Sequence, residues 1–154
     1  MSDDETLRKR TLSIVDAYQF LMAQQRWDEW IALWAEDGSL EFPFAPAPRP
    51  KIYVGRTAIL NYMREAAGSF VIESVASRHV HPMLDPQTVC GEMTIKGRLR
   101  ATGAPYDQQY VVFFEIVTGQ IQRYREYWNP LIALAAYGGV EAWLASTRHA
   151  GEQA

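Results

Sequence analysis

Hydrophobic residues recur at helical spacing in the first part of the chain. Between residues 3 and 25 they lie three, four or seven positions apart, and acids occupy the first turn, where the helix dipole favours them. Residues 27–36 predict a second, shorter helix closed by Asp37-Gly38, and Gly55-Arg56-Thr57 begins a third. Residues 39–44 alternate briefly as a strand, and the proline-rich run 42–50 predicts a loop across the mouth of a site.

From Ser69 onward the pattern changes to strands. Four β-type runs are separated by residues typical of turns, and they cover 70–82, 87–102, 106–117 and 120–129. Short connections between long strands favour an antiparallel, strongly curved sheet. A helical pattern returns over 131–147, interrupted near Gly138-Gly139.

This order predicts an α+β cone in which the N-terminal helices pack in the concave face of a curved antiparallel sheet. The open end of such a cone is a natural site for a small molecule. The other face of the sheet also needs cover, which suggests a homodimer packed sheet to sheet.

Composition narrows the function classes. A chain of 154 residues, 48% of them hydrophobic, predicts one domain over 1–154. A net charge of -3 disfavours nucleic-acid binding. The single cysteine, Cys90, excludes an internal disulfide framework, and no apolar run is long enough to span a bilayer, so we expect no membrane association and a cytoplasmic location.

The segment 119–134, GQIQRYREYWNPLIAL, carries the strongest chemical signal. Strand alternation places Ile121, Arg123, Arg125 and Tyr127 on one face and Gln122, Tyr124, Glu126 and Trp128 on the other. A carboxylate among aromatic rings has a raised pKa because its charged form loses solvation, which suits Glu126 to proton transfer. The alternative is that Glu126 only pairs with Arg123, Arg125 or another base.

Other polar residues are weaker candidates. Gln109 shares strand parity with Val111 and Phe113, which predicts a hydrogen-bonding amide on the interior wall. His79 and His81 share a face, but a metal site lacks an evident third ligand, since only His149 remains; one of the pair near the pocket mouth is the preferred interpretation. Arg49 and Lys51 flank the proline-rich loop and either bind a carboxylate-bearing ligand or face solvent.

The order of elements, with LWAEDGSLEFPF, VGRTAILNYM and GQIQRYREYWNPL, resembles the nuclear transport factor 2-like superfamily, and within it the SnoaL-like and ketosteroid-isomerase-like proteins. A closer resemblance is to the PhzA/PhzB proteins of phenazine biosynthesis, through Val89-Cys90-Gly91, 106–116 and 119–129, with its Arg-Glu-aromatic-x-Asn ending. The resemblance implies the cone fold, but this fold serves many activities.

Transferred residue by residue, the resemblance is mixed. The general-base aspartate of ketosteroid isomerases falls on Phe42, which cannot take a proton, whereas their oxyanion-hole tyrosine falls on Tyr18 and its partner acid at or near Gln109. In PhzA/PhzB proteins an acid at the position of Glu126 serves as proton donor in an imine-forming condensation, and a histidine on the third helix corresponds to Tyr62.

These observations support a small-molecule enzyme that isomerises, cyclises or condenses a cyclic, partly apolar metabolite by acid–base chemistry without a metal or other cofactor. The alternatives are a non-catalytic binding or carrier protein and a structural dimerisation module. The predicted catalytic residues are Glu126, Tyr18 and Tyr62. The predicted ligand-binding residues are Trp34, Phe42, Gln109, Phe113, Tyr124, Trp128 and His79.

Overall fold

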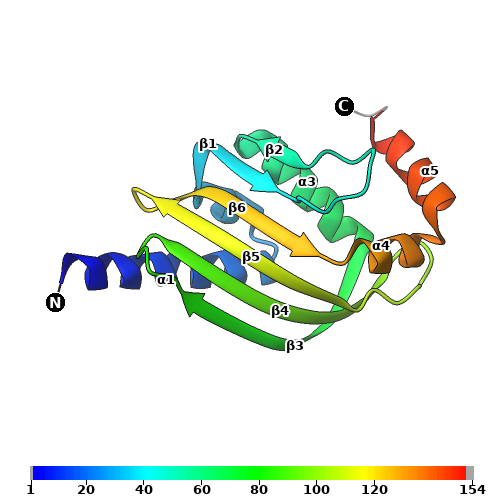
Figure 1. The fold of residues 1–154 in the computed structure, drawn as a ribbon. Helices are drawn as coiled ribbons and strands as arrows, with labels where there is room; N and C mark the ends of the chain where they lie inside the picture. The colour runs from blue at the N-terminus through cyan, green and yellow to red at the C-terminus, as the bar shows by residue number, and fades with distance from the viewer. Residues whose placement is uncertain (1, 152–154) are drawn as a thin grey trace.

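The computed structural model describes residues 2–151 of the chain, with side chains up to residue 146. Five helices and six strands follow one another along this part of the chain (Figure 1). They are α1 (Asp3–Ala23), α2 (Trp27–Ala32), β1 (Trp34–Glu41), β2 (Ile52–Val54), α3 (Arg56–Ser69), β3 (Phe70–Pro82), β4 (Thr88–Leu99), β5 (Gln108–Val117), β6 (Gln120–Trp128), α4 (Pro130–Tyr137) and α5 (Val140–Gly151).

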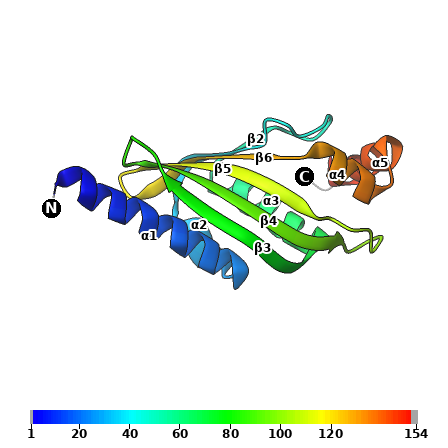
Figure 2. The same cartoon turned by 60° about the horizontal axis from the view of Figure 1, so that its bottom comes forward.

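The six strands form one curved, open sheet in the order β2-β1-β6-β5-β4-β3. Every neighbouring pair is antiparallel except β1 and β6, which run parallel. Helices α1, α2 and α3 lie on one side of the sheet, whereas α4 and α5 lie at the end away from the N-terminus (Figure 2). The predicted α+β cone, with helices in the concave face of a mainly antiparallel sheet, is confirmed.

Local sequence signals explain where several elements begin and end. The hydroxyl of Ser2 accepts a hydrogen bond from the backbone N–H of Glu5 (3.2 Å) and so caps α1. The side chain of Asn129 caps α4 in the same way, with Pro130 in its first turn. Gly138 ends α4 with a φ of 94°, a conformation that favours glycine, so the predicted helix break near Gly138-Gly139 is confirmed.

The second helix is shorter than predicted. It ends at Ala32, and Trp34 begins β1, so the expectation of a helix over residues 27–36 is wrong for its last four residues. Trp34 pairs with Ile121 of β6, and Ser39 pairs with Val54 of β2. Pairing with strands far along the chain overrides a local helical pattern, and β2 itself was not predicted.

Near its first residues, strand β6 contains one residue more than the paired segment of β5. Glu115 pairs with Arg123 and the next residue, Ile116, pairs with Ile121, so Gln122 is a bulge. The bulge turns Ile121 into the core, where it is fully buried. The prediction that Ile121 shares a face with Arg123 is therefore wrong, whereas Tyr124 and Glu126 stay on the face expected for them.

Two clusters of buried side chains fill the space between sheet and helices. The larger is centred on Trp30, Trp34, Leu40 and Ile59, all with no exposed surface. The smaller joins the far ends of β4 and β5 to α4 and α5 through residues such as Leu99. Both contain aromatic rings, which bury large areas. In the described part of the chain, no helix combines the length and hydrophobicity needed to cross a bilayer.

Candidate functional site

The candidate site lies on the concave face of the sheet, around the carboxyl group of Glu126. Glu126 pairs with Val112 of β5, and its neighbours on the same face of β6 are Tyr124 and Trp128. Beyond Val112 the next strand carries Gly91, where an added Cβ would lie 2.9 Å from a methyl carbon of Val112. A side chain at Gly91 would therefore crowd the sheet beside Glu126.

A tyrosine holds the carboxyl group of Glu126. The hydroxyl of Tyr124 donates a hydrogen bond of 2.6 Å to Oε2 of Glu126. The ring of Tyr18 from α1 stacks on that of Tyr124, with centroids 5.3 Å apart. A phenol has a single O–H, so the Tyr124 hydroxyl that donates to Glu126 has no second hydrogen to donate. Tyr124 therefore joins the carboxyl group of Glu126 to an aromatic side chain of α1.

The pKa of Glu126 lies near neutrality. Burial raises it from an ordinary value of 4.5 to about 7, and the hydrogen bond from Tyr124 opposes part of that rise. A carboxyl group with this pKa populates its protonated and ionised forms together at neutral pH. It can therefore give up or accept a proton without a large free-energy penalty.

Five tyrosines form what we call the tyrosine cluster: Tyr18, Tyr62, Tyr106, Tyr110 and Tyr124. In each of them burial raises the phenol pKa above its usual range, and the charge of Glu126 raises it further. Phenols in this state keep their protons at neutral pH. The cluster therefore surrounds one titrating carboxyl group with hydroxyl groups that act as hydrogen-bond donors.

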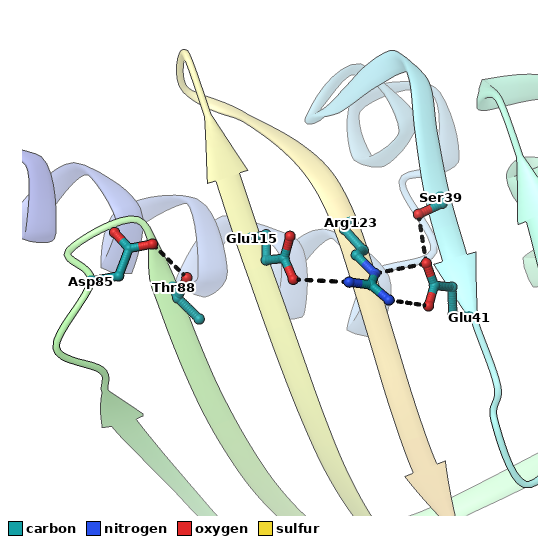
Figure 3. Close-up of polar contacts among 6 residues, drawn as sticks. All are labelled: Ser39, Glu41, Asp85, Thr88, Glu115 and Arg123. Carbon is teal, nitrogen blue, oxygen red and sulfur yellow. Dashed lines mark hydrogen bonds and ion pairs between the residues drawn. The ribbon is translucent and has the colours of Figure 1, made fainter.

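The two nearby arginines of β6 face away from Glu126. Arg123 binds Glu41 through two hydrogen bonds, Nε to Oε1 at 2.7 Å and Nη2 to Oε2 at 2.9 Å, and reaches Glu115 at 3.4 Å (Figure 3). The guanidinium of Arg125 lies 5.4 Å from the centre of the Phe113 ring. The alternative in which Glu126 pairs with either arginine is therefore not the arrangement found.

Several predicted site residues lie near the tyrosine cluster. The ring of Trp34 is 6.3 Å from Tyr18 and 6.1 Å from Tyr124. Phe42 contacts Tyr62, with ring centroids 4.9 Å apart. Trp128, next to Glu126 on the inner face, packs against both core clusters. The structure thus brings Glu126, Tyr18, Tyr62, Trp34, Phe42, Tyr124 and Trp128 into one region of the interior.

Three predicted residues lie on the opposite face, and these expectations are wrong. Gln109 is exposed, Phe113 pairs with Arg125, and His79 pairs with Glu92. All three belong to the outer face of the sheet, because directly paired residues share a face. His79 therefore lies away from the concave side rather than near its mouth.

The glutamine side chain on the inner face of β5 is that of Gln108, not that of Gln109. Gln108 is fully buried, its Nε2 donates to the carbonyl of Asn129 (2.9 Å), and its Oε1 accepts from the backbone N–H of Asn129 (3.0 Å). This pair of bonds fixes the chain where β6 leaves the sheet, three residues after Glu126. Gln108 is thus a structural neighbour of the site.

Tyr106, Gln108 and Tyr110 were not predicted as site residues, although a signal for them exists. Both faces of β5 carry apolar side chains, so hydrophobic alternation alone does not orient the strand. The charged residues Asp107 and Glu115 share the parity of Gln109, however. Two charges on one face mark that face as the outer one.

Two surface hollows of the described part of the chain lie away from Glu126. One lies beside Arg26 and Arg64, and the other beside Glu73 and Asp107. Among the side chains described, no three histidine, cysteine, aspartate or glutamate residues gather where a metal could bind. His81 instead contacts Glu92 at 2.7 Å, and His149 lies beyond the described side chains.

The chain is similar in sequence to a known domain family and to two bacterial proteins. The sequence pattern of the SnoaL-like domain matches residues 14–124. YesE of Bacillus subtilis, an uncharacterized protein, is 36% identical over 135 residues, covering 88% of this chain and 86% of that protein. PA3332 of Pseudomonas aeruginosa, an uncharacterized PhzA/B-like protein, is 34% identical over 113 residues, covering 73% of this chain and 79% of that protein.

Solved structures show the same fold. A Bacillus subtilis protein provisionally described as an isomerase has a TM-score of 0.80 at 31% identity, covering 91% of this chain and 98% of that one. A phenazine biosynthesis-related protein of Pseudomonas aeruginosa has a TM-score of 0.71 at 21% identity, covering 88% and 85%. At 21% identity, the likeness to the phenazine biosynthesis-related protein concerns the fold alone.

Proposed function

Because the chain belongs to the SnoaL-like family, within the nuclear transport factor 2-like fold, we propose that it is a small-molecule enzyme in which Glu126 transfers a proton. The reaction class is isomerisation, cyclisation or condensation of a cyclic, partly apolar metabolite. The observation that carries the proposal is the carboxyl group of Glu126: its pKa is about 7, and its partner is a tyrosine hydroxyl rather than an arginine.

In this proposal the carboxyl group and the phenols have different tasks. Glu126 lies among the tyrosines of the cluster and changes its protonation near neutral pH. It is therefore the proton donor or acceptor. The phenols of Tyr18 and Tyr62 keep their protons, so they polarise a ligand oxygen by hydrogen bonding rather than act as bases. When Glu126 becomes ionised, the hydrogen bond from Tyr124 stabilises its charge.

The rings that line the region set the class of ligand. Trp34, Phe42, Tyr124 and Trp128 offer apolar faces, which suit a flat or alicyclic molecule. Glu126 and Trp128 are half-buried rather than fully buried, which leaves part of their surface open to such a molecule.

The proposal is tested in two steps. Native mass spectrometry of protein taken directly from cells, followed by extraction, identifies a bound metabolite. Wild type, Glu126→Gln and the exposed control Glu73→Gln are then incubated with that metabolite. We expect Glu126→Gln to abolish conversion while it still binds the metabolite, and Glu73→Gln to convert it normally. Conversion by Glu126→Gln at the wild-type rate would refute the role of Glu126.

A non-catalytic binding protein for a hydrophobic small molecule is the second candidate. Phe42 and Tyr62 favour it, because they stand where related enzymes carry an aspartate and a histidine. This candidate predicts that the extracted metabolite is bound tightly and is recovered unchanged after incubation with wild type.

We also propose that two copies of the chain pair through the outer face of the sheet. That face presents Val111 and Phe113 beside acids such as Glu92 and bases such as Arg98. A surface with both signs of charge around apolar residues can complement itself across a twofold axis. Light scattering should then show a dimer in wild type and a monomer in Phe113→Lys; a wild-type monomer would refute the pairing.

A further inference from the structure

The loop between β1 and β2 carries a cation into the neighbourhood of the candidate site. The loop is closed at its base by a hydrogen bond of 2.8 Å from the N–H of Phe42 to the carbonyl of Lys51. The indole Nε1 of Trp143 in α5 donates to the carbonyl of Ala47 (3.3 Å), which ties the loop to the C-terminal helices. Figure 1 shows the loop running from the end of β1 to α5.

Aromatic side chains hold Arg49 in place on this loop. Its guanidinium carbon lies 4.5 Å from the ring centre of Trp143 and 5.6 Å from that of Tyr137. Nη2 donates to the Tyr137 hydroxyl at 3.1 Å. The residue is half-buried, so its position is fixed by packing rather than by solvent-exposed charge pairing.

Arg49 has donors to spare. A guanidinium has five N–H groups in a planar fork that matches the two oxygens of a carboxylate. Among the described side chains, none of the ion pairs includes Arg49. A half-buried guanidinium that is held by aromatic rings and has no carboxylate partner keeps N–H groups available to an anion.

Tyr62 links Arg49 to Glu126. The Tyr62 ring lies against Phe42, the first residue of the loop, and against Tyr53 of β2, with centroids 4.9 Å and 4.4 Å apart. Burial mainly raises the pKa of Tyr62; the charge of Glu126 raises it further, and the charge of Arg49 lowers it. Tyr62 therefore lies within electrostatic range of both groups.

We propose that Arg49 is a specificity-determining residue that binds a carboxylate of the ligand, so that the natural ligand is a cyclic carboxylic acid. This inference rests on the proposed site but not on its catalytic activity. The net charge of -3 repels anions from the protein as a whole, so a preference for an acid must come from a local cation. Arg49 supplies one, fixed beside aromatic rings that suit a cyclic body.

Two matched pairs of probes test this inference by binding alone: benzoate against benzamide, and cyclohexanecarboxylate against cyclohexanecarboxamide. At pH 7 both acids are ionised, and each amide has nearly the same shape without the charge. Calorimetry gives the affinities, and the Nε–Hε resonance of Arg49 in ¹⁵N-arginine-labelled protein, assigned with Arg49→Lys, reports contact directly. We expect at least one acid to bind wild type about tenfold more tightly than its amide and to move this resonance.

Three variants make the test specific. Arg49→Met should abolish the preference for the acid, whereas Lys51→Met, which removes an exposed charge from the same loop, should retain it. Arg49→Lys keeps a positive charge and should retain part of the preference. Glu126→Gln should bind the acid at least as tightly as wild type does, because it removes a negative charge and leaves Arg49 in place.

Two results would overturn the inference. One is equal affinity of wild type for acid and amide in both pairs, with the Arg49 resonance unmoved. The other is a preference for the acid that survives in Arg49→Met and disappears in Lys51→Met. If Glu126→Gln still converts the metabolite at the wild-type rate, the proposed catalytic role is refuted. The binding measurements on Arg49 remain valid in that case.

Discussion

The Tyr124 hydroxyl donates a 2.6 Å hydrogen bond to Oε2 of Glu126, two positions further along the same strand. Residues two apart on a strand share a face, so the bond is local in sequence. Its consequence is electrostatic: a donor that favours the ionised carboxylate works against the burial that disfavours it. The balance between the two places the Glu126 pKa in the range useful for proton transfer.

Removing this donor should raise the Glu126 pKa further. Tyr124→Phe keeps the ring and deletes the hydroxyl, so burial is no longer opposed. A hydrogen bond to a charged group contributes about 1.5–3 kcal/mol, which corresponds to a rise of about one to two pKa units. A ¹³C NMR titration of the glutamate side-chain carboxyl groups measures the change. Tyr53→Phe is the matched control, and an equal rise in both variants would contradict the assignment.

Glu126 should also make the protein less stable as the pH rises. The folded-state pKa of about 7 lies above the ordinary 4.5, so between these values the folded protein binds more protons than the unfolded chain. Stability contributed by the protonated form is present below pH 4.5 and is lost as the pH rises through about 7. The loss amounts to up to about 3 kcal/mol.

Urea unfolding of wild type and Glu126→Gln at several pH values between 4 and 8 isolates this effect. The free energy of unfolding of the variant, relative to wild type, should increase steadily across that range, since glutamine does not titrate. Glu73→Gln, a substitution at the surface, should not change the slope. A constant difference between Glu126→Gln and wild type would show that the Glu126 pKa is unperturbed.

Local patterns were sufficient to predict most of the fold. Alternation and turn residues defined β3 to its observed limits, 70–82, and the Gly138-Gly139 break separated α4 from α5. Such signals depend on neighbours in sequence. Trp34 shows where they fail: it continues a helical pattern, yet it pairs with Ile121 in the sheet, a partner that only the tertiary structure provides.

The candidate site was predicted only in part, for the same reason. Tyr124 and Glu126 lie on one strand face and could be paired from alternation alone. The remaining tyrosines reach Glu126 from α1, α3, β5 and the segment before β5, and no local pattern brings these elements together. The inner and outer faces of β5 were exchanged because both carry apolar side chains.

The orientation of β5 leads to a stability prediction for two adjacent glutamines. Gln108→Ala removes both bonds to the backbone of Asn129 and leaves a cavity where a fully buried side chain stood. We expect a loss of about 2–4 kcal/mol in the free energy of unfolding. Gln109→Ala on the exposed face should change it by no more than about 0.5 kcal/mol. Urea unfolding at one pH compares them, and equal losses would contradict the assignment of faces.

Arg123 provides the complementary test of the two faces of β6. Its hydrogen bonds hold the pKa of Glu41 below the usual range, on the side of the sheet opposite to Glu126 (Figure 3). Arg123→Met should therefore raise the Glu41 pKa toward its ordinary value and leave that of Glu126 near 7. Both carboxyl groups can be followed in the same ¹³C titration. A shift of the Glu126 pKa as large as that of Glu41 would mean that Arg123 contributes to the ionisation of the site. It would contradict the conclusion that the arginines of β6 do not pair with Glu126.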